Sequence, residues 1–281
     1  MEPLPGAPKG AARGRYRRVG CGSMGGESTT RTAPRGGGTG KAPAGGRTGQ
    51  RLSGLAVALG MVLFLGGFAW AAVVYRPYTV PTSSMSPTIG IGDRVLAQRV
   101  DGDEVRRGDV VVFHDRTWVA DAPVVKRVVA VGGDTVSCCT RGRLTVNGKQ
   151  IDEPYLKGGP AELTGFTTVK VPEGRLFLLG DERQGSLDST AHLTDAARGT
   201  VARTDVTARV DSVIWPMKGM LERPTGFAEL GALSQPGPLR TIVALIVAGA
   251  VLVLAGGAYG PVARLLGGGR GRTRTEPARA R

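Results

Sequence analysis

Residues 123–133 read PVVKRVVAVGG, a valine-rich run that ends in two glycines. Similar short aliphatic runs recur from Asp93 onward, separated by Gly, Asp or Pro at intervals of about 8–12 residues, which is typical of an all-β domain. They are RVLAQRV (94–100), GDVVVF (108–113), RLTVNGKQI (143–151), TTVKVPEGRLFLLGD (167–181) and RVDSVIWP (209–216). No segment between them carries a long 3.6-residue period, so the central part of the chain is predicted to be mainly β.

Two turns support this interpretation. Asn147-Gly148 lies between two apolar runs and is a strong two-residue hairpin signal. Pro172-Glu173-Gly174 predicts another turn, between VKV and RLFLLG.

An uncharged segment lies on either side of the β region. Residues 52–75 separate Arg51 from Arg76, and residues 241–263 separate Arg240 from Arg264. At about 1.5 Å per residue, each is long enough as a helix to cross a hydrocarbon core of about 30 Å. Both are predicted to be transmembrane helices.

The charges divide unevenly around these segments. The chain has 37 Lys+Arg against 23 Asp+Glu and a net charge of +14, and most of the basic excess lies in 1–51 and 264–281. Basic residues mark the cytoplasmic side of a span, so both tails are predicted to be inside and residues 76–240 outside the cytoplasm. The membrane accounts for the basic charge, and no nucleic-acid partner is predicted.

The resulting domain plan has five parts. A Gly-rich, disordered basic tail (1–51) is followed by a first helix (52–75), an extracytoplasmic β domain (76–240), a second helix (241–263) and a basic tail (264–281). The first helix is too long, and too far from the N-terminus, for a cleaved signal peptide. The second helix contains four glycines and Pro261, so packing on a surface remains an alternative to spanning.

The sequence predicts neither a metal site nor a catalytic histidine. With 3 Cys and 2 His the chain has no zinc-ligand spacing, and neither a metal nor another cofactor is expected. His114 and His192 lack an accompanying Gly-x-Ser-x-Gly nucleophile motif. Cys138 and Cys139 are predicted to be either a vicinal disulfide or two free thiols.

The chemical signal lies in four motifs that occur in order. They are Ser84-Met85-x-Pro87-Thr88, Arg107-Gly108-Asp109-Val110-Val111-Val112-Phe113, Lys126-Arg127-Val128-Val129-Ala130-Val131-Gly132-Gly133-Asp134 and Gly180-Asp181-x-Arg183-x-x-Ser186-x-Asp188-Ser189. Together they resemble the bacterial type I signal (leader) peptidases, membrane serine proteases with a Ser/Lys dyad, here in an actinobacterial-like form with a C-terminal membrane span. The resemblance covers roughly residues 80–189, and Arg198-Gly199-Thr200-Val201 and Ile214-Trp215-Pro216 extend it.

The resemblance implies a role for each matched residue. Ser84 would be the nucleophile and Lys126 the general base, which must be the neutral amine to accept a proton. At a pKa near 10.4 only about one lysine in 2,500 is neutral at pH 7, so burial in the valine-rich strand must lower the pKa of Lys126. The supporting roles would be those of Thr82 (oxyanion), Ser186 (orienting Lys126), Asp181 with Arg127 (an ion pair between strands) and Asp188.

The family also implies the substrate and the location. Val80 and Met85 would wall a pocket for small side chains at −1 and −3 of a preprotein signal peptide. The enzyme would act on the outer face of the cell membrane as a multi-pass protein, with membrane lipid and the secretion translocase as further partners. Ser83, Glu182 and Thr190 depart from the family pattern, and Thr190 stands where an Arg would pair with Asp188.

Two other functions are compatible with parts of the sequence. A self-cleaving Ser/Lys regulator of the repressor type shares the dyad, but it predicts a soluble chain with a DNA-binding module. A membrane-tethered β module that binds exported proteins without catalysis would not need an activated serine.

Overall fold

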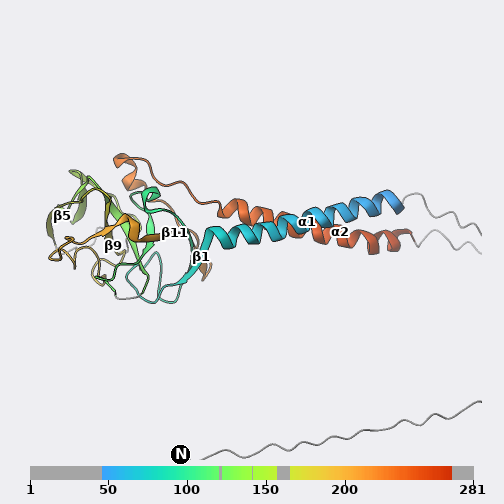
Figure 1. Ribbon diagram of the computed structural model, residues 1–281, viewed down its shortest axis with the longest axis horizontal. Helices are drawn as coiled ribbons and strands as arrows, with labels where there is room; N and C mark the ends of the chain where they lie inside the picture. Colours follow the sequence, from blue (N-terminus) through green and yellow to red (C-terminus); the bar gives the residue numbers. More distant parts are fainter. Residues whose placement is uncertain (1–45, 120–121, 141, 157–164, 268–281) are drawn as a thin grey trace, which may run out of the picture. The chain divides into compact units, whose positions relative to one another are not determined.

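The computed structural model describes residues 46–119, 122–140, 142–156 and 165–267. This part of the chain is mainly β, with two strongly apolar helices before and after the strands (Figure 1). The helices are α1 (Gly46–Val74) and α2 (Leu239–Gly267), and short 3-10 turns lie at Gly102–Glu104, Arg203–Asp205 and Thr225–Leu230.

The larger of two antiparallel sheets has eight strands. Its order is β1-β2-β11-β3-β4-β9-β10, with β12 added beside β11. The strands are β1 (Tyr75–Thr79), β2 (Arg94–Gln98), β3 (Val110–Phe113), β4 (Val124–Val131), β9 (Arg175–Leu179), β10 (Thr200–Ala202), β11 (Val206–Trp215) and β12 (Gly219–Met220). The run quoted first, PVVKRVVAVGG, forms β4, which lies between β3 and β9.

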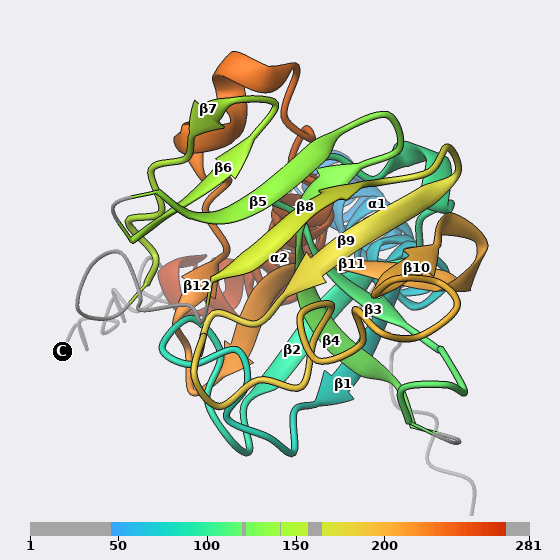
Figure 2. The same ribbon diagram turned by 90° about the vertical axis from the view of Figure 1, so that its left-hand side faces the viewer.

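The smaller sheet has four strands in the order β7-β6-β5-β8. They are β5 (Thr135–Thr140), β6 (Arg143–Val146), β7 (Lys149–Gln150) and β8 (Phe166–Lys170). Asn147 and Gly148 both have positive φ, 52° and 77°, and form the tight β6–β7 turn that the sequence predicts. The predicted turn at Pro172–Gly174 joins β8 to β9 and thus connects the two sheets (Figure 2).

The buried apolar side chains form three clusters, of which one joins both sheets and the other two lie on the larger sheet and its loops. Val128, Val129 and Ala130 of β4 are all fully buried, as are all four residues of β3. Cys138 and Cys139, both in β5 of the smaller sheet, form a disulfide.

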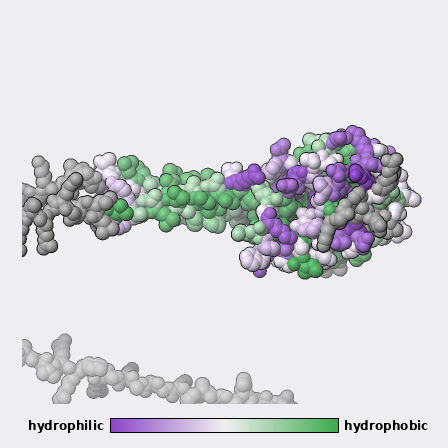
Figure 3. Space-filling view, turned by 180° about the vertical axis from the view of Figure 1, so that it is seen from behind, coloured by the Kyte–Doolittle hydropathy of each residue, from purple (hydrophilic) through white to green (hydrophobic). Residues whose placement is uncertain are grey.

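The helices α1 and α2 are each long and apolar enough to cross a membrane. They lie side by side, and their surface is almost uniformly apolar (Figure 3). Small residues allow this close approach: Ser53 Oγ donates to Gly256 O at 2.7 Å, and a Cβ on Gly60 would lie 2.8 Å from Gly249 O.

The helix boundaries differ from the predicted ones at several ends. The first helix begins at Gly46, earlier than predicted, because the polar turn before Leu52 is also helical. Tyr75, predicted as its last residue, instead begins β1. Most of both predicted basic tails lies outside the described residues.

Candidate active site

Ser84 lies in the loop that joins β1 to β2. Two backbone hydrogen bonds close this loop, from Val80 N to Asp93 O at 2.9 Å and from Gly92 N to Val80 O at 2.8 Å. Met85 and Ile89 anchor it because both side chains are fully buried in the core. Ser84 is therefore held by its apolar neighbours and is itself 7% exposed.

Lys126 lies on β4, and its side chain extends to Ser84. Its Nζ donates to Ser84 Oγ at 2.7 Å, across 42 residues of sequence. Burial lowers the pKa of Lys126 to about 8, and the charges of Asp188 and Asp181 act in the opposite direction. At this pKa about a tenth of the amine is neutral at pH 7, and the same contact can then run with the Ser84 hydroxyl donating to Nζ.

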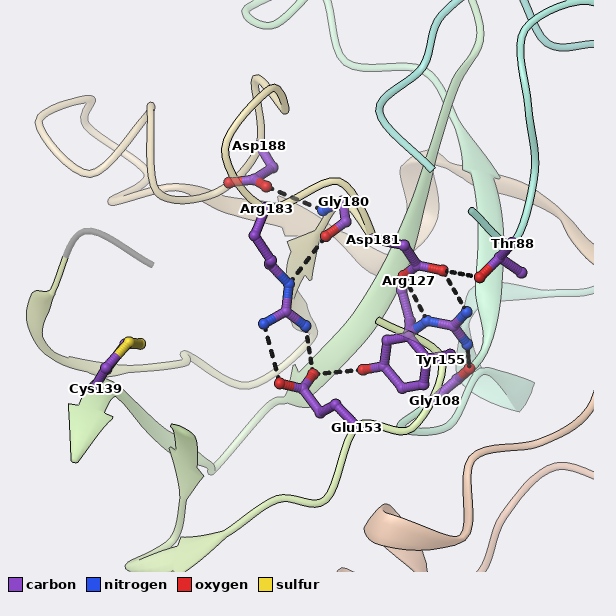
Figure 4. A network of polar contacts seen from close by, with 11 residues as sticks. Thr88, Gly108, Arg127, Cys139, Glu153, Tyr155, Gly180, Asp181, Arg183 and Asp188 are labelled. Carbon is purple, nitrogen blue, oxygen red and sulfur yellow. Dashed lines mark hydrogen bonds and ion pairs between the residues drawn. A yellow bond between two sulfur atoms is a disulfide. The ribbon is translucent and has the colours of Figure 1, made fainter. Parts of the chain in front are cut away.

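Arg127 and Asp181 form the predicted ion pair. Arg127 Nε donates to Asp181 Oδ1 at 2.8 Å and Nη2 donates to Oδ2 at 2.6 Å, and both side chains are almost fully buried. Thr88 Oγ1 also donates to Asp181 Oδ2 at 2.6 Å (Figure 4). Asp181 lies in the turn that follows β9. It therefore links this turn to β4 and to the β1–β2 loop, which contains Ser84.

Asp188 has partners despite the departure at Thr190. Its Oδ1 accepts from Thr190 N at 3.1 Å and from Thr190 Oγ1 at 2.7 Å, and its Oδ2 accepts from Gly180 N at 3.0 Å. The threonine thus supplies neutral donors where an arginine would supply a charged one. Asp188 is therefore hydrogen-bonded without an arginine.

Ser186 is placed differently from the sequence-based expectation. The structure has no hydrogen bond from Ser186 to Lys126, and Ser186 Oγ is buried without a hydrogen-bond partner in the described part of the chain. The Lys126 amine is engaged by Ser84 instead. Ser186 Oγ nevertheless lies close to Ser84, since both approach the same face of Gly180.

A cavity of about 310 Å³ opens beside Ser84 and Lys126. Val80 and Thr82 both line it, and Thr82 Oγ1 lies 3.2 Å from Ser84 Oγ. Met85 does not line it, and the prediction that it walls the pocket is wrong, because the side chain is fully buried in the core. The other lining residues are Tyr78, Thr79, Pro81, Val119, Ala122, Pro123, Val124, Val125, Gly185 and Leu187.

The histidines lie away from this cavity. His192 stacks on Trp118 with ring centroids 4.5 Å apart and pairs with Asp195 at 2.8 Å. His114 follows β3, where its backbone N–H donates to Asp205 O. Among the described residues no group of three or more His, Cys, Asp or Glu side chains could hold a metal ion.

Gly180 leaves no room for a side chain at the centre of the site. A Cβ there would lie 2.2 Å from Ser186 Oγ and 2.4 Å from Ser84 O. We expect Gly180→Ala to displace Ser84 and to lower kcat at least about 100-fold, because misplacement of reacting groups by about 1 Å has that effect. Initial rates of substrate cleavage measure this. Gly54→Ala, at an exposed position of α1 where a Cβ would meet no atom within 4 Å, is the control, and equal rates for the two variants would contradict the expected crowding.

Sequence reasoning missed Glu153 and Tyr155. Glu153 accepts hydrogen bonds from Arg183, and the Tyr155 ring lies 3.9 Å from the guanidinium carbon of Arg127. The only available signal was a Glu-Pro-Tyr segment after the predicted hairpin, and nothing in one sequence indicates that this segment returns to β4.

Three comparisons with known proteins show what the chain is similar to. The family described as "Signal peptidase, peptidase S26" matches residues 52–215. The chain is 32% identical over 193 residues to a signal peptidase I of Mycobacterium tuberculosis, covering 51% of this chain and 66% of the relative, slightly less than two thirds of its length. It is 38% identical over 128 residues to a signal peptidase I of Bacillus licheniformis, covering 42% of this chain and 67% of that one. A solved signal peptidase I of Enterococcus faecalis aligns with a TM-score of 0.30 and 25% identity, over 42% of this chain and 97% of that one.

Proposed function

Because the chain belongs to the S26 signal peptidase family, we propose that it is a membrane-bound serine endopeptidase that removes N-terminal signal peptides from exported preproteins. One observation carries the proposal: Ser84 Oγ and Lys126 Nζ are 2.7 Å apart at the edge of a cavity. A serine is a weak nucleophile until a neighbouring base takes its proton, and Lys126 is the base within reach.

The reaction proceeds in two halves. Neutral Lys126 takes the Ser84 proton as Oγ attacks the scissile carbonyl, and the protonated lysine then donates that proton to the leaving amine. Lys126 next takes a proton from a water molecule as the water attacks the acyl-enzyme, and it returns that proton to Ser84 Oγ as the bond between Oγ and the acyl carbon breaks.

The developing oxyanion accepts hydrogen bonds from the Ser84 backbone N–H and the Thr82 hydroxyl, and a single such donor is typically worth about 2.7–4 kcal/mol of barrier. Asp188 holds the backbone of Gly180 by accepting from its N–H.

The cavity fits the substrate class expected of the family. Its volume of about 310 Å³ is small, and Val80, Val124 and Val125 give it an apolar wall. It accepts small side chains at −1 and −3 of the cleavage site and excludes large ones.

Two helices and the charge distribution support a membrane location. Both α1 and α2 have the length and hydropathy of a span. The basic residues outside them place both tails in the cytoplasm. The protein is thus a multi-pass cell-membrane protein with its catalytic domain on the extracytoplasmic face, where lipid and the secretion translocase are its neighbours.

Cleavage of a purified preprotein by the chain in detergent or lipid vesicles tests this function. The expected product is a mature protein whose new N-terminus, read by mass spectrometry, follows small residues at −1 and −3. A preprotein with a bulky residue at −1 is the matched control and should stay intact. A native chain that neither cleaves any of several preproteins nor reacts at Ser84 with an acylating probe would instead be the binding module.

A further inference from the structure

Two buried arginines hold the turn that follows β9. Arg127 is 2% exposed and donates hydrogen bonds to Asp181. Arg183 is 8% exposed, and its Nε donates to Gly180 O at 3.0 Å. This turn also touches the nucleophile, because Glu182 N donates to Ser84 O at 3.0 Å. A displacement of either arginine would therefore be transmitted to Ser84.

A single short segment, Glu153 to Tyr155, contacts both arginines. Glu153 accepts from Arg183 Nη1 at 3.0 Å and also from Nη2. Tyr155 donates its hydroxyl to Glu153 Oε1 and places its ring 3.9 Å from the Arg127 guanidinium (Figure 4). The segment follows β7 in the connection toward β8, and neither residue lines the cavity.

We infer that Glu153 and Tyr155 are positioning residues for the peptidase reaction: they clamp Arg127 and Arg183, which fixes the 180–188 turn against Ser84 and keeps water away from Lys126. This inference rests on the proposed Ser84–Lys126 chemistry. Neither residue touches the reacting atoms, so they act only through the two arginines.

Energetics favour this role over a purely stabilising one. Burying a guanidinium is costly, and a buried ion pair often contributes no more to stability than well-packed apolar residues would. These ion pairs instead fix the orientation of the guanidinium groups. Arg183 donates to both carboxylate oxygens of Glu153 and also to the carbonyl oxygen of Gly180. The aromatic face of Tyr155 balances the charge of Arg127 without competing with Asp181 for its N–H groups.

The clamp also affects the protonation of the general base. Burial lowers the pKa of Lys126, and the charged groups acting against it are Asp188 and Asp181. A loosened Arg127 would leave the Asp181 charge less neutralised and would admit water. Both changes raise the pKa of Lys126, so damage to the clamp should be most severe at neutral pH.

The test is the pH profile of kcat and KM for Tyr155→Leu, Tyr155→Phe and Glu153→Gln in the full chain, with a peptide spanning a signal-cleavage site. A rise of about one unit in the apparent pKa lowers the neutral lysine fraction about tenfold at pH 7 and less than twofold at pH 10. We therefore expect Tyr155→Leu and Glu153→Gln to lose about tenfold in kcat at pH 7 and to recover at pH 10, with KM changed less than about twofold. Tyr155→Phe keeps the ring and should retain most of the activity, which is rescue by the conservative variant.

Controls separate this inference from the proposed function. Glu229→Gln, in an exposed pair with Lys149, should have the native profile. If Ser84→Ala still cleaves the peptide, the proposed chemistry fails, whatever the clamp variants do. If Ser84→Ala is inert, a native profile in Glu153→Gln, or an equal loss at every pH, overturns the clamp alone. Glutamine has the same shape as glutamate. If Tyr155→Leu unfolds below the assay temperature, the pH profile of Glu153→Gln alone therefore tests the inference.

Discussion

Ser84→Ala is expected to lower kcat for preprotein cleavage by about 10³- to 10⁶-fold, the range found when a serine protease loses its nucleophile. The variant removes only Oγ, the atom that Lys126 Nζ and Thr82 Oγ1 contact. Binding of the substrate should persist, because the cavity walls are unchanged. Initial rates and a competition binding measurement with native enzyme check both halves of this prediction.

The matched control is Ser83→Ala, at the exposed residue next to the nucleophile. It should retain activity within about threefold, since exposed substitutions outside a site usually have small effects. If Ser84→Ala and Ser83→Ala cleave at similar rates, Ser84 is not the nucleophile.

Lys126→Met is expected to lose activity as completely as Ser84→Ala and yet to be more stable at neutral pH. Lysine and methionine have similar lengths, so the methionine should fill the space along β4. The folded-state pKa of Lys126 is about 8, against 10.5 without the protein environment, so burying the protonated amine costs at most roughly 3 kcal/mol.

The sign of this effect depends on pH. Below pH 8 the lysine is protonated in both the folded and the unfolded state, and the whole cost is present. Between pH 8 and 10.5 the folded state has lost the proton and the cost declines, and above 10.5 it is absent. The melting temperature of Lys126→Met should therefore exceed the native value at pH 7 and approach it at pH 10.5. If Lys126→Met instead melts at a lower temperature than the native chain at pH 7, the buried, protonated lysine does not destabilise the fold.

Much of the fold follows from local sequence. The valine-rich runs form β2, β3, β4, β6 and β11, because β-branched residues favour extended backbone and their apolar faces fill the core. Asn147-Gly148 adopts the positive φ angles that a two-residue hairpin demands. The pairing order was not predictable, since β11 lies between β2 and β3 although more than 90 residues separate it from either along the chain.

The candidate site was predictable only where a residue type carries the chemistry. A serine, and a lysine in an apolar strand, can be recognised from their motifs, and the structure brings Ser84 and Lys126 together. Met85 could not be assigned correctly, because a loop residue beside the nucleophile can point either to the cavity or to the core. Glu153 and Tyr155 were missed because their partners, Arg183 and Arg127, lie more than 25 residues away along the chain, and tertiary contacts of this kind leave no local pattern.

The pH dependence of kcat/KM tests the central claim most directly, namely that a neutral, buried Lys126 activates Ser84. The measurement uses the purified chain in detergent with a preprotein between pH 6 and 10. We predict a rate that rises about tenfold per pH unit below an apparent pKa of about 8 and levels off above it, because each unit there raises the neutral fraction of the lysine tenfold. A flat profile, or one that rises only above pH 10, would contradict the account.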